Sequence, residues 1–249
     1  MRLKKENIFW RIQMNKIISS TSNNLIKKIA KILAKGDEDY FVIEGLNFIK
    51  EAINSGAKIK YIFELTTQNN FTNSIKITEN VLRKITFTSN PQGCVALITK
   101  PLSKKNGKNI VFCDNVQDPG NIGTIIRSAL AFGYDTIFTN INTYNPKILR
   151  ATQGAIFKIN IINYKNAEDE LKILKNTHKI YISTLSNDAE NIEKIKFPIH
   201  NKVIVLGNEG HGVSEELYKY ADNKIYIPID FESLNVAVAA GIILHRSRK

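Results

Sequence analysis

Residues 111–135 decide the fold class of this chain, and their sequence is VFCDNVQDPGNIGTIIRSALAFGYD. An apolar run ends in polar residues and a Pro-Gly pair, and a helical pattern that contains Arg127 follows. A buried strand, a glycine turn and an amphipathic helix in this order form the first half of a parallel β-α-β unit. The stretch therefore predicts an α/β domain with a mostly parallel sheet.

The same alternation continues along the rest of the chain. Apolar runs typical of buried strands occur at 110–116, 136–140, 179–184, 202–207 and 224–229. Helical spacing of apolar residues occurs at 122–132, 167–176, 214–220 and 234–245. Strands that alternate with helices indicate a parallel sheet covered by helices on both faces.

The N-terminal part of the chain predicts a separate, smaller α/β domain. An amphipathic helix with lysines on its polar face ends at Gly36. Strands are expected at 40–45, 58–65 and 93–99, with helices at 46–56 and 77–86 between them. The polar, basic segment 101–109 contains Pro101 and Gly107 and is expected to be a linker. The predicted domains are therefore 1–100 and 110–249.

The charge balance indicates a polyanionic partner. The chain has 35 Lys and Arg residues against 23 Asp and Glu, a net charge of +12. Binding of basic side chains to phosphates releases counterions and adds affinity, so nucleic acid is the expected partner. The compositional alternative stays open, because Ile, Asn and Lys are abundant throughout the sequence.

Metal sites and membrane spans are not expected. The two cysteines, Cys94 and Cys113, lie in apolar stretches, and the four histidines follow no ligand spacing, so no metal site is predicted. The sequence has no apolar run approaching the roughly 18 residues that would span a membrane. We therefore expect a soluble, cytoplasmic protein.

The glycines after residue 118 do not fit a dinucleotide-binding motif. Gly120 and Gly123 give GxxG rather than GxGxxG, and the next strand ends at Asn140 rather than at an acid. A Rossmann oxidoreductase is therefore disfavoured. Arg127 lies one helical turn after Gly123, where it could be solvated or could lie at the edge of a cleft.

Two further segments combine a strand end with a turn and a helix. Segment 205–217, VLGNEGHGVSEEL, has three glycines whose missing side chains would let a ligand approach the backbone, and Ser214 is expected to cap a helix. In segment 227–246, IPIDFESLNVAVAAGIILHR, the strand is expected to end at Pro228 and Ser233 to cap a helix that begins at Leu234.

These segments resemble the three motifs of the SpoU (TrmH) family of RNA ribose 2'-O-methyltransferases, in the SPOUT superfamily. The matching motifs are NVQDPGNIGTIIRSALAFG, VIVLGNEGHGVSEEL and IPIDFESLNVAVAAGIIL, and 144–159 resembles the family's connecting segment with Lys-x-x-Arg-Ala. Region 20–100 is similar to the L30e-like substrate-binding domain of many members. The third motif has a shorter turn than is usual, and Thr152 stands where serine is more common.

The resemblance implies a SPOUT α/β domain with a deep trefoil knot, an obligate homodimer, and S-adenosylmethionine as cofactor. It implies active-site roles for Asn121, Arg127, Glu209, Ser233 and Asn235. Cofactor contacts are implied for Leu206, Gly207, Gly210, Ile227, Pro228, Leu234 and Asn235, and RNA contacts for Glu44, Lys147 and Arg150.

A ribose 2'-hydroxyl is a weak nucleophile that must be oriented and relieved of its proton. Because the guanidinium pKa is so high, we expect Arg127 to bind the target phosphate and polarise the hydroxyl rather than act as a base. Glu209 and Asn121 would hold the loops and the ribose. The expected function is methylation of large-subunit (23S) rRNA. The alternatives are tRNA 2'-O-methylation and a non-catalytic RNA-binding or assembly factor.

Overall fold

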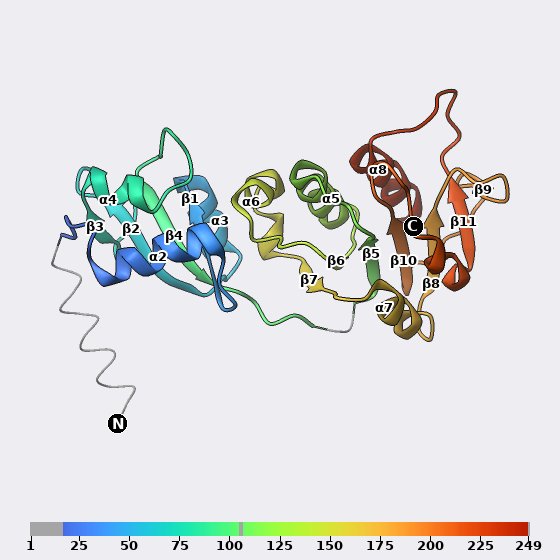
Figure 1. Cartoon of the computed structure of the whole chain (residues 1–249), viewed down its shortest axis with the longest axis horizontal. Helices are drawn as coiled ribbons and strands as arrows, with labels where there is room; N and C mark the ends of the chain where they lie inside the picture. The colour runs from blue at the N-terminus through green and yellow to red at the C-terminus, as the bar shows by residue number, and fades with distance from the viewer. Residues whose placement is uncertain (1–16, 105–106, 249) are drawn as a thin grey trace. The chain divides into compact units, whose positions relative to one another are not determined.

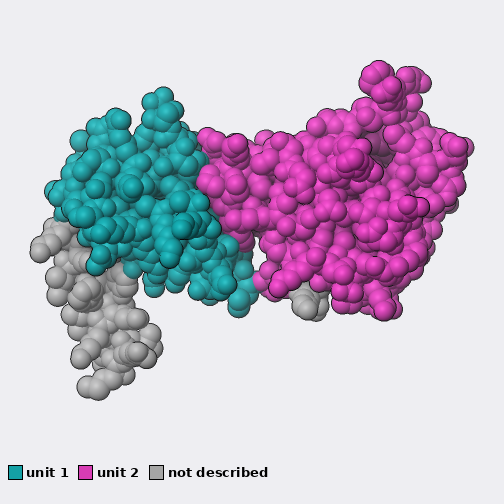
Figure 2. Space-filling model, viewed as in Figure 1, with its two compact units in different colours: residues 1–102 teal, residues 103–249 magenta. Residues whose placement is uncertain are grey.

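The chain divides into two compact units, residues 1–102 and 103–249 (Figure 2). The structure is a computed structural model that describes residues 17–104 and 107–248. The first sixteen residues of the expected N-terminal domain, and residues 105 and 106 of the expected linker, lie outside the described residues. Each unit is built around its own sheet.

Unit 2 contains a parallel sheet of seven strands in the order β7-β6-β5-β10-β8-β11-β9 (Figure 1). The strands are β5 (Asn109–Cys113), β6 (Thr136–Thr139), β7 (Asn160–Asn163), β8 (Lys179–Ser183), β9 (Glu190–Asn191), β10 (Lys202–Leu206) and β11 (Asn223–Tyr226). All the strand pairings are parallel, and every residue of the central strands β5 and β10 is buried. The predicted α/β class with a mostly parallel sheet is therefore confirmed.

Helices cover both faces of this sheet. They are α5 (Pro119–Ala131), α6 (Pro146–Thr152), α7 (Ala167–Leu174) and α8 (Val236–Ser247), with 3-10 turns η1 (Ala155–Phe157) and η2 (Glu215–Tyr220). α5 packs against α6 and α8 on one side of the sheet, and α7 lies on the other (Figure 1). On the α7 side, the Phe112 ring stacks on Phe138 and Tyr164, with ring centroids 5.6 and 4.8 Å apart.

Helix α5 begins three residues earlier than its apolar spacing predicts. Pro119 occupies its first turn, and the Asp118 side chain accepts a hydrogen bond from the Asn121 backbone N–H at 2.8 Å. Gly120 and Gly123 therefore lie inside the helix, so the expected glycine turn is wrong. A Cβ on Gly123 would lie 2.3 Å from the Ala151 Cβ, so this glycine allows α5 and α6 to pack closely.

The starts of two later helices also differ from the predicted ones. The strand expected to end at Pro228 ends at Tyr226, and α8 begins at Val236. Its cap is Asn235, whose side-chain oxygen accepts from the N–H groups of Ala237 (2.9 Å) and Val238 (3.3 Å). Ser233 is therefore not the cap. Segment 215–220 is a 3-10 turn, and the Ser214 side chain makes no capping hydrogen bond.

Unit 1 has a four-stranded sheet in the order β1-β4-β2-β3 (Figure 1). Its elements are α2 (Asn24–Lys35), β1 (Tyr40–Glu44), α3 (Leu46–Asn54), β2 (Ile59–Leu65), β3 (Ile75–Ile77), α4 (Glu79–Lys84) and β4 (Cys94–Thr99). β4 pairs antiparallel with β1 and β2, and the short β3, which the apolar spacing missed, pairs parallel with β2. Cys94 here and Cys113 in unit 2 are fully buried, as expected.

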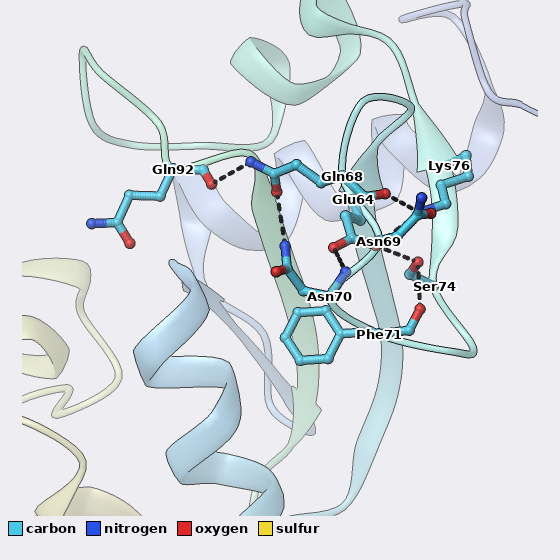
Figure 3. A network of polar contacts seen from close by, with 8 residues as sticks. All are labelled: Glu64, Gln68, Asn69, Asn70, Phe71, Ser74, Lys76 and Gln92. Carbon is cyan, nitrogen blue, oxygen red and sulfur yellow. Dashed lines mark hydrogen bonds and ion pairs between the residues drawn. The ribbon is translucent and has the colours of Figure 1, made fainter.

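A buried carboxylate fixes the loop between β2 and β3 (Figure 3). Glu64 is 0% exposed and accepts hydrogen bonds from the Asn70 backbone N–H (2.6 Å), the Ser74 hydroxyl (2.8 Å) and the Lys76 ammonium (2.9 Å). Burial alone would raise the pKa of the Glu64 carboxyl, but these hydrogen bonds outweigh it and hold the pKa below its ordinary value. Glu64 is therefore an anchor of unit 1.

Glu64→Gln should destabilise unit 1 by about 2 to 4 kcal/mol, because it leaves Lys76 without its anionic partner. The pKa of Glu64 is lowered by folding, so its contribution is complete above the ordinary carboxyl pKa and is lost as pH falls through the folded value. Urea denaturation across acid pH should show this pH dependence in the wild type and less of it in the variant.

The matched control is Glu79→Gln, which breaks the exposed Glu79–Arg83 pair on α4. An exposed i,i+4 pair contributes about 0.5 kcal/mol or less, so this variant should unfold nearly as the wild type does. Equal losses in the two variants would contradict the anchoring role of Glu64.

Candidate active site

Three polar segments meet near one edge of the unit 2 sheet. β5 and β10 are parallel neighbours, with Cys113 in register with Leu206, so the segments after them leave the sheet at the same edge. The first segment leads into α5, the second is the loop 207–214, and the third precedes α8. The ends of parallel strands commonly build binding sites in α/β folds.

The Asn121 side chain connects all three segments. Its amide nitrogen donates to the Glu209 carboxylate at 2.9 Å, and its amide oxygen accepts from the Asn235 amide nitrogen at 3.0 Å. An amide carries both donors and an acceptor, so one neutral side chain satisfies both partners. The structure thus brings together three of the five active-site residues that the sequence predicts.

Glu209 is held as a carboxylate by the start of α5. Its oxygens also accept hydrogen bonds from the backbone N–H groups of Gln117 (3.3 Å) and Asp118 (3.2 Å). Burial alone would raise the pKa of Glu209, but the hydrogen bonds from Asn121 and from the backbone lower it below its ordinary value. At neutral pH Glu209 is therefore a charged acceptor, which suits it to ordering the loops better than to removing a proton.

The loop 207–214 is closed by its own hydrogen bonds. The backbones of Asn208 and Gly212 pair at 2.9 and 3.0 Å, and the Asn208 side-chain oxygen accepts from the Gly210 N–H at 2.9 Å. The Asn208 amide nitrogen donates to the Asn115 carbonyl at 2.8 Å. The loop therefore has a defined shape and is fastened to the segment after β5.

Two acids outside the predicted set also hold this region. Asp114 accepts from the Ser214 backbone N–H at 2.7 Å and so fastens the end of the loop, while Asp118 caps α5. Asp118 could have been found in the sequence, because an Asp directly before Pro is typical of a helix start. Asp114 gives no comparable signal, since its partner lies 100 residues away.

The three glycines of the loop have different roles. A Cβ on Gly207 would lie 2.1 Å from the Gly212 carbonyl carbon and 2.2 Å from the Val213 nitrogen. The expectation that Gly207 leaves room for a ligand on that side is therefore wrong, because the loop's own backbone fills the space. Gly212 has φ +71°, in the left-handed region, whereas a Cβ on Gly210 would meet only the Asn208 side-chain oxygen, at 3.7 Å.

Arg127 lies on the same helix as Asn121, six residues further on, which is about 9 Å along the helix axis. Its side chain is exposed, and it has no hydrogen-bond or ion-pair partner among residues 17–104 and 107–248. A guanidinium in this position is available to an external anion such as a phosphate.

The segment between β11 and α8 presents unpaired backbone. Within the described part of the chain, no backbone hydrogen bond involves residues 227–234, and the Ser233 side chain has no partner there either. Pro228 and Leu234 are exposed, Ile227 is partly buried, and Leu206, at the end of β10, is almost fully buried. The N–H and C=O groups of this segment are therefore available to a polar ligand.

The three predicted RNA contacts lie in different surroundings. Lys147 and Arg150 are exposed on α6, the neighbour of α5. Glu44 ends β1 in unit 1, and its half-buried carboxylate accepts from Thr88 and from the Phe87 backbone N–H at 3.1 Å. This structural role of Glu44 was not apparent from the sequence.

Neither a metal-binding cluster nor a membrane-spanning helix is found among the described residues. Among residues 17–104 and 107–248, no three His, Cys, Asp or Glu side chains gather in a way that could hold a metal ion. In the same part of the chain, no helix combines the length and the apolar character needed to cross a membrane.

Comparison with known proteins follows the same division of the chain. A model of the SpoU rRNA Methylase family matches residues 108–245, and a model of the MRM3-like substrate binding domain matches residues 23–96. The 23S rRNA (guanosine(2553)-2'-O)-methyltransferase RlmP of Bacillus subtilis is 33% identical, over 94% of this chain and 99% of its own length.

Solved structures agree with these matches. The crystal structure of an rRNA methyltransferase from Sinorhizobium meliloti has a TM-score of 0.82 and 28% identity, over 94% of this chain and 97% of that chain. An AdoMet-bound rRNA methyltransferase structure from the same organism gives the same TM-score. The A. aeolicus TrmH/SpoU tRNA modifying enzyme has a TM-score of 0.50 and 32% identity, over 59% of this chain and 75% of that chain.

Gly207→Ala should destabilise unit 2 by about 3 kcal/mol and distort the loop, because its Cβ would overlap fixed backbone. Gly210→Ala, the matched control in the same loop, should change stability by about 0.5 kcal/mol or less. Thermal unfolding of both variants checks the prediction. Equal tolerance of the two alanines would contradict the loop geometry.

Proposed function

The chain belongs to the SpoU rRNA methylase family, and we propose that it methylates a ribose 2'-hydroxyl in large-subunit rRNA, with S-adenosylmethionine as methyl donor. The observation that carries this proposal is the Asn121–Glu209–Asn235 network, which joins the three segments that match the family motifs. On the same helix as Asn121, Arg127 is exposed and has no partner among the described residues. A cytoplasmic location, where rRNA is modified, is part of the proposal.

The residues present suit the cofactor. S-adenosylmethionine carries amino, carboxylate, hydroxyl and adenine groups, which need backbone and side-chain hydrogen-bond partners. The unpaired backbone of 227–234 offers such partners, and Gly210 leaves open space beside the second loop. We assign the cofactor contacts to Leu206, Gly207, Gly210, Ile227, Pro228, Leu234 and Asn235. For Leu206, which is almost fully buried, and for Gly207, whose side-chain position is filled by the loop's own backbone, the contact would be through the backbone.

When bound, the cofactor supplies an electrophilic methyl group on a sulfonium. The protein must hold the ribose hydroxyl in line with that methyl and favour loss of the hydroxyl proton. Arg127 would bind the phosphate next to the target ribose and polarise the hydroxyl, since a guanidinium stays charged at neutral pH. Glu209, itself ionised, keeps Asn121 oriented, and Asn121 and Ser233 would contact the ribose.

Coverage of the whole chain favours rRNA over tRNA as the substrate. The rRNA enzymes align with more than nine-tenths of this chain, unit 1 included, whereas the tRNA enzyme aligns with 59% of it. The match of residues 23–96 to a substrate-binding domain supports a role for unit 1 in holding RNA, and we propose Lys147 and Arg150 as further contacts on unit 2. A purely non-catalytic role is disfavoured by the complete network and the available Arg127.

A second copy of the chain would complete the assembly. Val238 and Ile242 lie one turn apart on α8 and are 53% and 40% exposed, and Leu234 just before the helix is exposed as well. Such an apolar stripe beside a catalytic segment suits the interface of a homodimer. A trefoil knot formed by the chain around the loop 207–214 is also part of this proposal.

Arg127→Ala should lower the rate of methyl transfer to unmodified large-subunit rRNA at least about 100-fold, because a main positioning charge is lost. Its affinity for S-adenosylmethionine, measured by calorimetry, should stay within about twofold of the wild type, that is, within roughly 0.4 kcal/mol. Arg83→Ala, on α4 of unit 1, is the control for loss of an exposed arginine and should keep its rate. An unchanged turnover rate of the Arg127→Ala variant would show that Arg127 has no role in methyl transfer.

Ile242→Glu should convert the protein to monomers and abolish methyl transfer, because it places a charge in the proposed interface. The control is Ile173→Glu on α7, where the isoleucine is 62% exposed but lies away from α8. Sedimentation velocity reports the oligomeric state of both. A wild type that sediments as a monomer would refute the dimer without touching the assignment of the reaction.

A further inference from the structure

The lysine face of α2, which we define as Lys27, Lys28, Lys31 and Lys35, is the most concentrated positive charge among residues 17–102. All four side chains are exposed, and α2 contains no acidic residue. Lys27, Lys31 and Lys35 follow one another at intervals of four and so lie along one line of the helix surface.

This face accounts for the whole charge excess of residues 17–102, the described part of unit 1. Residues 17–102 contain 11 Lys and Arg and 7 Asp and Glu, a net charge of +4. α2 alone contributes +4, so the other seven basic residues are balanced by seven acids. Of those others, Lys76 pairs with Glu64 and Arg83 pairs with Glu79. Within residues 17–102, the net positive charge is therefore that of one helix.

The lysines of this face have no partner carboxylate within the described part of the chain. Among residues 17–104 and 107–248, the one contact of the face is the Lys28 ammonium over the Tyr40 ring, 5.4 Å from its centroid. Like charges at i,i+4 destabilise a helix, and a cation near a helix N-terminus opposes the helix dipole. The arrangement therefore costs stability in the free protein, and a bound polyanion would relieve that cost.

The packing of α2 distinguishes RNA from a membrane surface. A basic amphipathic helix binds lipid by inserting its apolar face between headgroups. In α2 that face is already in the core of unit 1, where Ile26 and Ile29 are 0% exposed and Ile32 is 6% exposed. Only the charged face is left for a partner, which suits phosphates in solution.

We infer that the lysine face of α2 binds the phosphate backbone of the RNA substrate. The inference rests on the proposed function and adds the surface by which unit 1 holds the RNA. Lysine ammoniums contact phosphates as point charges without reading bases, so the face supplies affinity and orientation, while the choice of nucleotide stays with unit 2. Each neutralised phosphate releases counterions, which makes the contribution visible in the salt dependence of binding.

The test variant is Lys27→Gln/Lys31→Gln/Lys35→Gln, which keeps helix-forming side chains on α2. Its matched control is Lys50→Gln/Lys58→Gln/Lys172→Gln, with the same change in net charge at three exposed lysines scattered over other elements. The affinity of each protein for a large-subunit rRNA fragment is measured over a range of salt concentrations. Circular dichroism checks that both variants fold.

We expect the logarithmic salt slope of the α2 variant to fall by about 2 to 3, since each phosphate contact contributes roughly 0.7 to 0.9. Affinity at physiological salt should fall at least tenfold, while the S-adenosylmethionine affinity and the rate at saturating RNA stay those of the wild type. The control should change neither slope nor affinity by as much. This combination supports a role in docking rather than in chemistry.

Three results would overturn the inference. One is an α2 variant whose RNA affinity and salt slope equal those of the control. Another is a wild type that binds phosphatidylserine vesicles through these lysines while RNA binding is unaffected. The third is a wild type that methylates no RNA at all, which would remove the proposed function and this inference with it. The first two leave the proposed function standing, so the failures are distinguishable.

Discussion

The amide of Asn121 is the interaction on which the site depends. It donates to Glu209, 88 residues further along the chain, and accepts from Asn235, 114 residues further along. Each partner is also held by backbone: Glu209 by the N–H groups at the start of α5, and Asn235 by the first turn of α8 that it caps. The same groups shape the helix ends and join the three segments. The geometry of the site therefore depends on the local folding of all three segments. Loss of one partner from this network would therefore cost more free energy of folding than the hydrogen bonds of that partner alone would suggest.

The electrostatics of this network divide the roles among its members. Glu209 is the one ionised member, and it is stabilised in that form by the donors around it, with its pKa below the ordinary range. Arg127 stays outside the network with its charge available. The site therefore combines a fixed internal anion that orders the loops with a cation free to meet a phosphate. This arrangement suits a reaction in which the protein must orient an RNA ribose rather than change its own protonation state at every turnover.

Much of the fold could be predicted from the sequence, because buried parallel strands leave long apolar runs. The short elements could not be predicted in this way. β3 has three residues, β7 is flanked by asparagines, and α6 begins at a proline, so none shows a full period of apolar residues. In the site, residue types indicated Asn121, Glu209 and Asn235, but their contacts depend on long-range packing. The role of Gly207 was misjudged for the same reason: the group that excludes its side chain is the backbone of residues 212 and 213, which only the folded loop brings there. Ser233 and Asn235 are both good caps, and only the path of the chain decides between them.

The proposed reaction is methylation of a ribose of large-subunit rRNA. The most direct test is to map 2'-O-methyl groups across rRNA and tRNA from cells with and without the gene, and again with the wild-type chain restored. We expect one ribose of large-subunit rRNA to lose its methyl group without the gene and to regain it on restoration, with tRNA unchanged. An rRNA map that is identical in both cells, or a loss confined to tRNA, would contradict it.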